Sequence, residues 1–258
     1  MTDESVPNDH PRKKSLELRE KIAEGIRTKV VTLTGMAAHG RGEAFDYILG
    51  EKTTEPAMKA MTAAVAAFLT AKHGVISVNG NAAALVSKEI VEFAKEVNAK
   101  IEINIFYHAE GRLEAIEKTM KESGAKELLG LNENARESIP ELTSNRRFVD
   151  PEGIYKADVV LVPLEDGDRT EALVKMGKKV IAIDLNPLSR TALMSQITIV
   201  DNVVRAIPTM TKIAKEMKSS KTSQDIQQIV DTYNNKEIIK EVLKEISNYL
   251  NERINFIG

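Results

Sequence analysis

The chain has 258 residues, of which 42% are hydrophobic and 29% are charged, and its formal net charge is −2. These values are typical of a globular protein with one large α/β domain or two small ones, and they exclude a global basic field that would attract nucleic acid or an anionic membrane. The absence of cysteine excludes disulfides and thiolate chemistry, and no apolar run approaches the ~20 residues of a membrane span, so we expect a cytoplasmic protein.

The first half of the chain begins with a polar tail, for which we expect residues 1–9. Residues 11–27 place apolar side chains at helical spacing and predict a helix. Glu55-Pro56 predicts the start of a second helix, extending to residue 72, because proline is well tolerated in a first turn. The apolar run of residues 75–78 predicts a strand, and a helix over residues 83–97 is expected to follow it.

The middle of the chain contains another strand and helix, followed by a less regular stretch. Residues 101–106 predict the strand, and the helix after it is expected to end at Gly124. Residues 131–149 are polar and irregular, which predicts either a surface loop over a site or a flexible excursion. Asp150-Pro151 then resembles a helix N-cap followed by a first-turn proline.

The second half alternates strands and short helices. The strands are predicted near residues 158–163, 179–183 and 197–200. Such alternation indicates a parallel sheet with right-handed crossovers, and so an open α/β fold flanked by helices. Two further helices are expected from about residue 223, separated by Asn234-Asn235. With no repeat and no Gly/Ser-rich linker, we predict one domain over residues 10–258, with helical appendages at both ends.

The glycine-rich segment Gly35–Glu43 is the first candidate site. Glycine lets a backbone approach a phosphate, and Arg41 offers a planar fork of donors for phosphate or carboxylate. Its spacing matches neither the P-loop nor the dinucleotide fingerprint. A glycine-rich turn with a solvated arginine explains the same residues equally well.

Polar residues also follow four of the predicted strands, and ligands in open α/β sheets bind beyond the carboxyl ends of strands. Asn79-Gly80-Asn81 offers side-chain amides to a substrate, although Asn-Gly also favours a plain turn. The run Glu165–Arg169 offers carboxylates suited to Mg²⁺, or a helix cap at Asp168. Asp201-Asn202 repeats the pattern and is also expected to cap a helix.

The most informative strand end is the one that follows residues 179–183. Asp184-Leu185-Asn186 places a carboxylate where sugar hydroxyls are commonly held, and Arg190 and Thr191 extend toward a phosphate. The alternative is a turn stabilised by Asn186-Pro187. No histidine pair has metal-ligand spacing, and no nucleophile elbow of a serine hydrolase is present. These patterns alone predict a ligand-binding α/β domain.

Taken together, these segments resemble the archaeal phosphopantothenate synthetase family, also called 4-phosphopantoate–β-alanine ligase. The resemblance extends over nearly the whole chain after residue 9, and is weakest in residues 131–147 and the final forty residues. The resembling segments are His10–Arg12, Leu18–Glu20, Ala38–Tyr47, Gly50–Ala57, Ser77–Asn81, Glu152–Leu173 and Gly177–Ala192.

The resemblance implies a Rossmann-like, homodimeric enzyme of coenzyme A biosynthesis. It would condense 4-phosphopantoate with β-alanine, using ATP and Mg²⁺, to give 4′-phosphopantothenate, AMP and diphosphate through an acyl-adenylate. Arg41 and Arg190 would act in catalysis as counter-charges, with no protein nucleophile. We expect the substrate to contact His39, Gly40, Asn79 and Asn81. The implied ATP contacts are Arg19, Arg41, Asp184, Leu185, Asn186, Arg190, Thr191, Asn202 and Val203.

Three other classes of protein compete with this interpretation. A nicotinamide-dependent oxidoreductase lacks its dinucleotide fingerprint here. A non-catalytic nucleotide-binding module is compatible with the charged strand ends, but it would bind ATP without forming product. A purely structural dimer, built on the C-terminal helices and the alanine-rich helix 55–72, would leave the polar strand ends unexplained.

Overall fold

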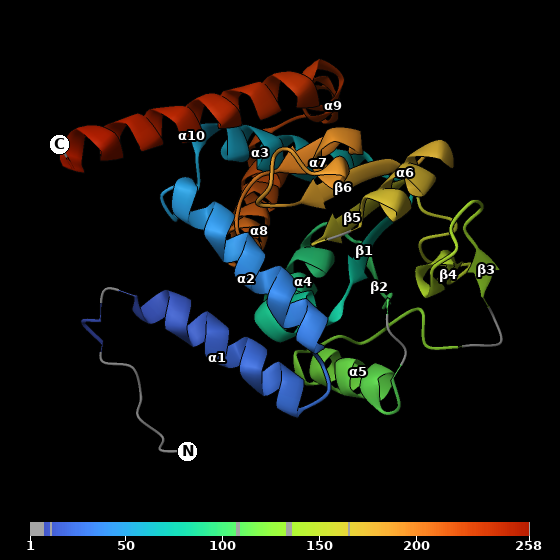
Figure 1. The fold of residues 1–258 in the computed structure, drawn as a ribbon. Helices are drawn as coiled ribbons and strands as arrows, with labels where there is room; N and C mark the ends of the chain where they lie inside the picture. The colour runs from blue at the N-terminus through green and yellow to red at the C-terminus, as the bar shows by residue number, and fades with distance from the viewer. Residues whose placement is uncertain (1–7, 11, 107–108, 133–135, 165, 258) are drawn as a thin grey trace.

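The computed structural model describes residues 8–10, 12–106, 109–132, 136–164 and 166–257 (Figure 1). The predicted tail therefore lies almost entirely outside the described residues. Within them, no helix is both long enough and apolar enough to cross a bilayer.

A five-stranded parallel sheet forms the centre of the molecule, in the order β2-β1-β5-β6-β7. Every strand pair of this sheet is parallel, which the alternation of strands and helices predicted. The prediction of an open, mostly parallel sheet flanked by helices is thus confirmed. The strands are β1 (Gly74–Val78), β2 (Lys100–Ile103), β5 (Val159–Pro163), β6 (Lys179–Ile183) and β7 (Ile197–Ile199).

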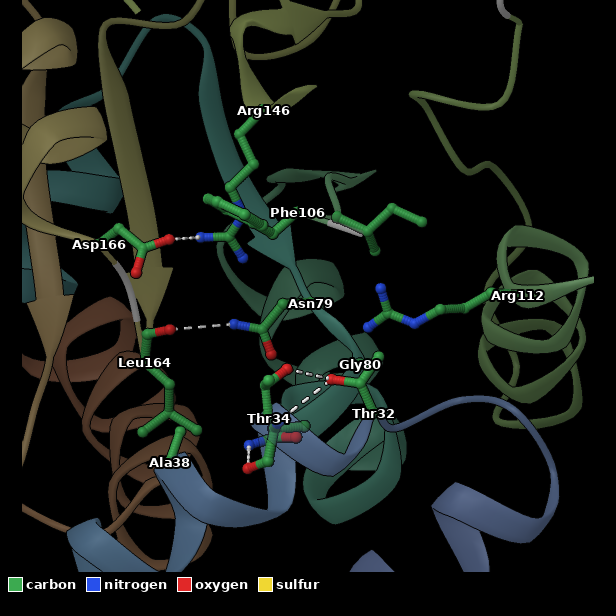
Figure 2. Close-up of a pocket in the computed structure, with 13 residues that line it drawn as sticks. Thr32, Thr34, Ala38, Asn79, Gly80, Phe106, Arg112, Arg146, Leu164 and Asp166 are labelled. Carbon is green, nitrogen blue, oxygen red and sulfur yellow. Dashed lines mark hydrogen bonds and ion pairs between the residues drawn. The ribbon is translucent and has the colours of Figure 1, made fainter. Parts of the chain in front are cut away.

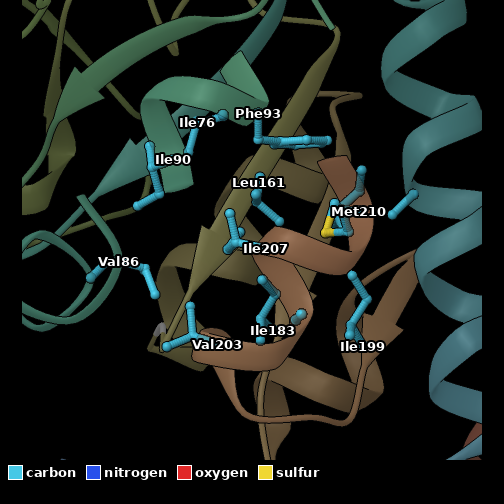
Figure 3. Packing of buried hydrophobic residues seen from close by; sticks show 14 of the residues in the cluster. Ile76, Val86, Ile90, Phe93, Leu161, Ile183, Ile199, Val203, Ile207 and Met210 are labelled. Carbon is cyan, nitrogen blue, oxygen red and sulfur yellow. The ribbon is translucent and has the colours of Figure 1, made fainter. Parts of the chain in front are cut away.

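One face of this sheet is covered by apolar helices. Alternate strand residues such as Leu161 and Ile183 point into this layer, as the two-residue period of a strand requires. Figure 3 shows them meeting Phe93, Ile207 and Met210 from the helices. The helices of this layer are α3 (Glu55–Thr70), α4 (Gly80–Glu96) and α8 (Val203–Ser220), with α5 (Arg112–Glu122) packed beside α4.

The opposite face is covered by shorter elements. Val160 and Val162 of β5 point to this side, where they join Leu173 of a helix and Val149 of a small hairpin in a second apolar cluster. The elements that contribute to this layer are α6 (Gly167–Lys175), the antiparallel pair β3 (Glu137–Ser138) and β4 (Phe148–Val149), and the 3-10 helix η1 (Asn145–Arg147).

The remaining helices lie at the ends of the chain and beside the sheet (Figure 1). The two predicted C-terminal helices are confirmed. The first begins at residue 223, and the second begins at residue 235, where Asn234-Asn235 was predicted to separate them. They pack on α3, and the last one also reaches α2. The elements are α1 (Lys13–Arg27), α2 (Leu33–Ile48), α7 (Arg190–Met194), α9 (Ser223–Thr232) and α10 (Asn235–Ile257).

Of the two interpretations left open for Gly35–Glu43, the glycine-rich turn is wrong, because the segment lies inside α2. Thr32 caps this helix by accepting a hydrogen bond from the Gly35 amide at 3.0 Å. Glycine costs about 1 kcal/mol in a helix interior, and here close packing outweighs that cost. A Cβ on Gly35 would lie 2.7 Å from Oδ1 of Asn81.

Two helix starts and one strand end also differ from prediction. Asp150-Pro151 opens a series of turns, since the Asp150 carboxylate accepts from the amides of Gly130 and Glu152 instead of capping a helix. The helix after β5 begins at Gly167, so Asp166 is its N-cap and Asp168 lies in its first turn. The second strand ends at Ile103, before the predicted residue 106.

Candidate functional site

The switch in strand order lies between β1 and β5. From β1 the chain crosses through α4 to β2 on one side, whereas β5, β6 and β7 follow on the other. A crevice forms at such a point beyond the carboxyl ends of the strands. A cavity of about 230 Å³ is located there. Its lining comprises Thr32, Thr34, Gly35, Ala38, Asn79, Gly80, Asn81, Ile105, Phe106, Arg112, Arg146, Leu164 and Asp166.

Two helices point their N-termini at this cavity. Asn79 caps α4 by accepting from the Ala82 amide at 3.0 Å, and its Nδ2 donates to the Pro163 carbonyl at 2.7 Å, which joins the ends of β1 and β5. Thr32 caps α2 at the same place, and Nδ2 of Asn81 donates to the Gly35 carbonyl at 2.8 Å. Helix N-termini carry partial positive charge and favour anions.

Two buried arginines extend into the same space from other elements. Arg112 is the first residue of α5, and Arg146 belongs to η1. Figure 2 shows both guanidinium groups directed toward the region around Asn79. Nη1 of Arg146 donates to Oδ2 of Asp166 at 3.4 Å. Two fixed cations and two helix N-termini therefore converge on one cavity, which is the arrangement expected for binding a phosphate or carboxylate.

Burial removes water from these two guanidinium groups and so raises the free energy of their charged forms. It lowers the pKa of Arg146 to about 9, assisted by the neighbouring charge of Arg169, and it lowers the pKa of Arg112 as well. A guanidinium still carries its charge at neutral pH under these conditions. A charge in a low-dielectric cavity is stabilised by an opposite charge. An anionic ligand would therefore offset the desolvation cost of the two guanidinium groups.

Gly80 is required where α4 meets this site. A Cβ at this position would lie 2.2 Å from the Val30 carbonyl oxygen and 2.8 Å from Nη2 of Arg112. The Asn-Gly-Asn sequence therefore serves as a helix cap followed by a close approach of backbone, and not as a plain turn.

A second group of predicted residues lies at the carboxyl end of β6. The Asp184 carboxylate accepts from the Asn186 amide at 2.9 Å and from the Ser189 hydroxyl. Burial raises the pKa of Asp184, although these bonds and the charge of Arg41 act in the opposite direction. Asp184 and Arg41 thus belong to one electrostatic neighbourhood.

Arg190 begins α7 beside this group. Its Nε lies 2.9 Å from Oε1 of Glu171, and a Cβ on Gly167 would collide with its side chain at 2.7 Å. Four of the predicted ATP contacts, by contrast, are buried: Leu185, Thr191, Asn202 and Val203. Their side chains pack inside the protein, so a ligand at this edge would meet mainly their backbone.

Asn202 follows β7 and caps α8, as predicted. Its Nδ2 donates to Oδ2 of Asp46, at the far end of α2, at 2.9 Å. Arg205 lies 2.6 Å from a carboxylate oxygen of Asp46 and 2.6 Å from one of Asp201. This buried network ties the end of β7 to α2.

Helix α2 therefore runs along the carboxyl edge of the sheet from the end of β1 to the end of β7. Its start contacts α4 through Asn81, its middle approaches Leu185 where a Cβ on Gly42 would lie 3.5 Å away, and its end bonds Asn202. Arg19 reaches the outer side of this helix from α1, where it pairs with Glu43 at 2.9 Å and donates to the Tyr47 hydroxyl.

The predicted substrate contacts divide into two groups. Asn79 and Asn81 line the cavity. His39 and Gly40 do not. His39 is buried, desolvation lowers its pKa, and its nearest charges are Glu43 and Arg19, while Gly40 is exposed. Among the described residues, Nε2 of His39 has no hydrogen-bond partner.

The acidic run after β5 does not form a metal cluster with its neighbours. Glu165 lies outside the described residues, Asp166 lines the cavity beside Arg146, and Asp168 is exposed in the first turn of α6. Over the part of the chain that the structure describes, no three histidine or acidic side chains are grouped to hold a metal ion. A divalent cation would therefore need ligands from the substrate as well.

Sequence patterns missed Arg112 and Arg146. Arg112 is one of several charged residues at the start of an amphipathic helix, and Arg146 lies in the polar stretch 131–149. Neither has a spacing that indicates burial. The only available signal was that a polar excursion between strands of an α/β sheet often contributes to a site.

Comparisons with known proteins show the family of this chain. A family model described as phosphopantothenate/pantothenate synthetase matches residues 56–249. A 4-phosphopantoate–β-alanine ligase of Thermococcus kodakarensis is 54% identical over 247 residues, covering 95% of this chain and 94% of that one. A protein of the same name from Methanosarcina mazei is 50% identical over 250 residues, covering 97% and 96%. The resemblance seen in the sequence is confirmed.

Proposed function

We propose how this chain, which belongs to the phosphopantothenate/pantothenate synthetase family, uses its site as a 4-phosphopantoate–β-alanine ligase of coenzyme A biosynthesis. The reaction joins the carboxylate of 4-phosphopantoate to the amine of β-alanine at the expense of ATP. The observation that carries the assignment of groups is the cavity at the switch point, with two buried arginines and two helix N-termini.

The cavity suits the phosphorylated end of 4-phosphopantoate. A phosphate matches Arg112, Arg146 and the first turns of α2 and α4, because guanidinium groups and helix N-termini both favour phosphate. The apolar lining by Ala38, Ile105 and Leu164 suits the two methyl groups of pantoate. In this orientation the carboxylate points out of the cavity along α2.

ATP then lies further along the same edge, at the ends of β6 and β7. In this proposal Asp184 accepts from ribose hydroxyls, and Arg41 and Arg190 offset phosphate charge. Arg19, Leu185, Asn186, Thr191, Asn202 and Val203 remain proposed ATP contacts, with Leu185, Thr191 and Val203 contributing backbone groups.

In this arrangement the carboxylate of 4-phosphopantoate and the triphosphate of ATP are neighbours along α2, which allows the following reaction. The pantoate carboxylate oxygen attacks the α-phosphorus of ATP, which forms an acyl-adenylate and releases diphosphate. The amine of β-alanine then attacks the acyl carbon, loses a proton, and displaces AMP. The chain contributes orientation and counter-charge, which account for large rate effects without a protein nucleophile.

Mg²⁺, a homodimer and a cytoplasmic location complete the proposal. Mg²⁺ usually takes one or two protein carboxylates together with substrate phosphates, which fits a site without a preformed metal cluster in the described residues. Bound with ATP, it would neutralise charge on the triphosphate. Exposed apolar residues near the end of α10, including Phe256 and Ile257, offer a surface for a second copy. The cytoplasm supplies ATP.

The test is a turnover assay with ATP, Mg²⁺, 4-phosphopantoate and β-alanine that resolves AMP, ADP and phosphopantothenate. We expect AMP to appear in step with phosphopantothenate, and only when both substrates are present. Formation of ADP and phosphate without AMP would contradict the acyl-adenylate. ATP binding without any product, from folded protein, would favour a nucleotide-binding module instead.

A further inference from the structure

Two buried polar side chains on β2 and its continuation face the segment that carries Arg146. Glu102 and Asn104 are two residues apart, and the Asn104 amide continues the ladder with a hydrogen bond to the Val78 carbonyl at 2.9 Å. Alternate residues of a strand share a face. Both side chains therefore project to the same side of the sheet.

Asn104 holds the start of the segment. Its Nδ2 donates to the Phe148 carbonyl at 3.0 Å and to the Arg146 carbonyl at 3.4 Å. The guanidinium of Arg146 enters the cavity, and Phe148 lies two residues further along the chain. The backbone around Arg146 is thus anchored to the sheet.

Glu102 holds the rest of the segment. It is 0% exposed and accepts from the amide of Asp150 at 3.1 Å and from that of Ile154 at 2.6 Å. Both partners are donors, so a carboxylate, which only accepts, suits them better than an amide would. A Cβ on Gly153 would lie 2.0 Å from Oε2, so glycine is required for the backbone to approach this closely.

We propose that Glu102 is a positioning residue for substrate binding: with Asn104 it clamps the backbone of residues 146–154 and so fixes the guanidinium of Arg146 in the phosphate cavity. This inference rests on the proposed function, because it needs Arg146 to bind the substrate phosphate. It assigns a role to a buried carboxylate that touches neither substrate nor reacting atoms.

The electrostatic surroundings of Glu102 make this clamp sensitive to pH. Burial raises the pKa of Glu102 to about 7, although the Ile154 and Asp150 amides and the charge of Arg169 oppose the shift. The charged groups that act on it are Arg169 of α6, Asp150 and Lys178. Below this pKa one oxygen carries a proton and no longer accepts freely from an amide, so the clamp loosens as pH falls.

Glu102→Gln tests this role, with Asp158→Asn as a matched control. Asp158 also accepts from two backbone amides, those of Lys72 and His73 at 2.8 and 2.9 Å, but it precedes β5 at the opposite edge of the sheet. Steady-state kinetics are measured from pH 6 to 8.5 for both variants, for Arg146→Ala and for the unmodified protein, together with thermal unfolding.

We expect KM for 4-phosphopantoate to rise roughly tenfold or more in Glu102→Gln, since small displacements of a binding group have large effects. KM for ATP and kcat should change less than twofold, and the dependence of KM on pH near 7 should disappear. The ionisation of the substrate phosphate, with a pKa of about 6, should remain visible in every variant. Asp158→Asn should leave all kinetic constants unchanged.

An unchanged KM and pH profile in folded Glu102→Gln would overturn the positioning role, and so would an equal loss in Asp158→Asn. If Glu102→Gln does not fold, Asn104→Ala gives the same readout: a raised KM for 4-phosphopantoate supports the clamp and an unchanged one overturns it. If the unmodified protein is an active ligase and Arg146→Ala keeps a normal KM, the proposed phosphate site itself is wrong.

Discussion

Two arginines at the carboxyl edge of the sheet, Arg205 partly buried and Arg146 buried, have opposite surroundings. Arg205 lies 2.6 Å from carboxylate oxygens of both Asp46 and Asp201, and although burial opposes it, the hydrogen bond with Asp46 and the charges of both acids raise its pKa. Arg146 donates to the exposed Asp166 at 3.4 Å, and burial lowers the pKa of Arg146 to about 9.

The difference indicates that Arg205 stabilises the fold and that Arg146 binds a ligand. Desolvating a cation costs several kcal/mol, and carboxylates of the chain itself offset that cost at Arg205. At Arg146 burial outweighs the nearby acids, so the protein keeps a destabilised cation in a cavity. Such local cost is common where a site is organised for an oppositely charged ligand. The same substitution at both positions, arginine to methionine, tests this distinction.

Arg205→Met should give the largest effect on stability. It leaves Asp46 and Asp201 buried without their shared cation, and breaking a buried pair in this way costs about 3–5 kcal/mol. Equilibrium urea unfolding measures the loss. KM for 4-phosphopantoate in the folded variant should stay within about twofold, because the residue lies outside the phosphate cavity. A stability unchanged within about 1 kcal/mol would contradict the structural role.

Arg146→Met should have the opposite pattern. The acid that Arg146 bonds, Asp166, is exposed and stays hydrated without its partner, while the desolvation cost of the cation is removed, so unfolding should need at least as much urea as before. The loss of charge-assisted bonds to phosphate, about 3 kcal/mol, should lower kcat/KM for 4-phosphopantoate roughly 100-fold. Arg146→Lys should recover part of this activity. Normal kcat/KM in the methionine variant would remove Arg146 from the site.

The two arginines also show what sequence reasoning can and cannot predict. Local periodicity and turn chemistry were enough to predict the parallel sheet, the helix cap at Asn202 and the C-terminal helices. Gly35 of α2 was misread, because its cost in a helix is offset by close packing against Asn81, a residue distant in sequence. Arg146 was missed for the same reason: its burial depends on Asn104 and on the packing of the excursion, which no local pattern records.

Asp184→Asn should give the smallest effect, at the other end of the proposed site. Losing the charge but keeping the shape should raise KM for ATP about tenfold, the equivalent of about 1.4 kcal/mol, and leave KM for β-alanine unchanged. Equal changes for both substrates would refute a nucleotide role.

Stability provides a second readout for the same variant. Burial raises the pKa of Asp184, so its ionised form is disfavoured in the folded protein. Stability from such a group is present below the ordinary aspartate pKa of about 4 and is lost as pH rises through the raised value. Thermal unfolding of Asp184→Asn should therefore match the unmodified protein near pH 3 and exceed it at pH 7. A lower melting temperature at pH 7 would mean that the hydrogen bonds to Asn186 and Ser189 outweigh the cost of burial. Asp184 would then resemble Arg205, a charge kept for the fold, more than Arg146.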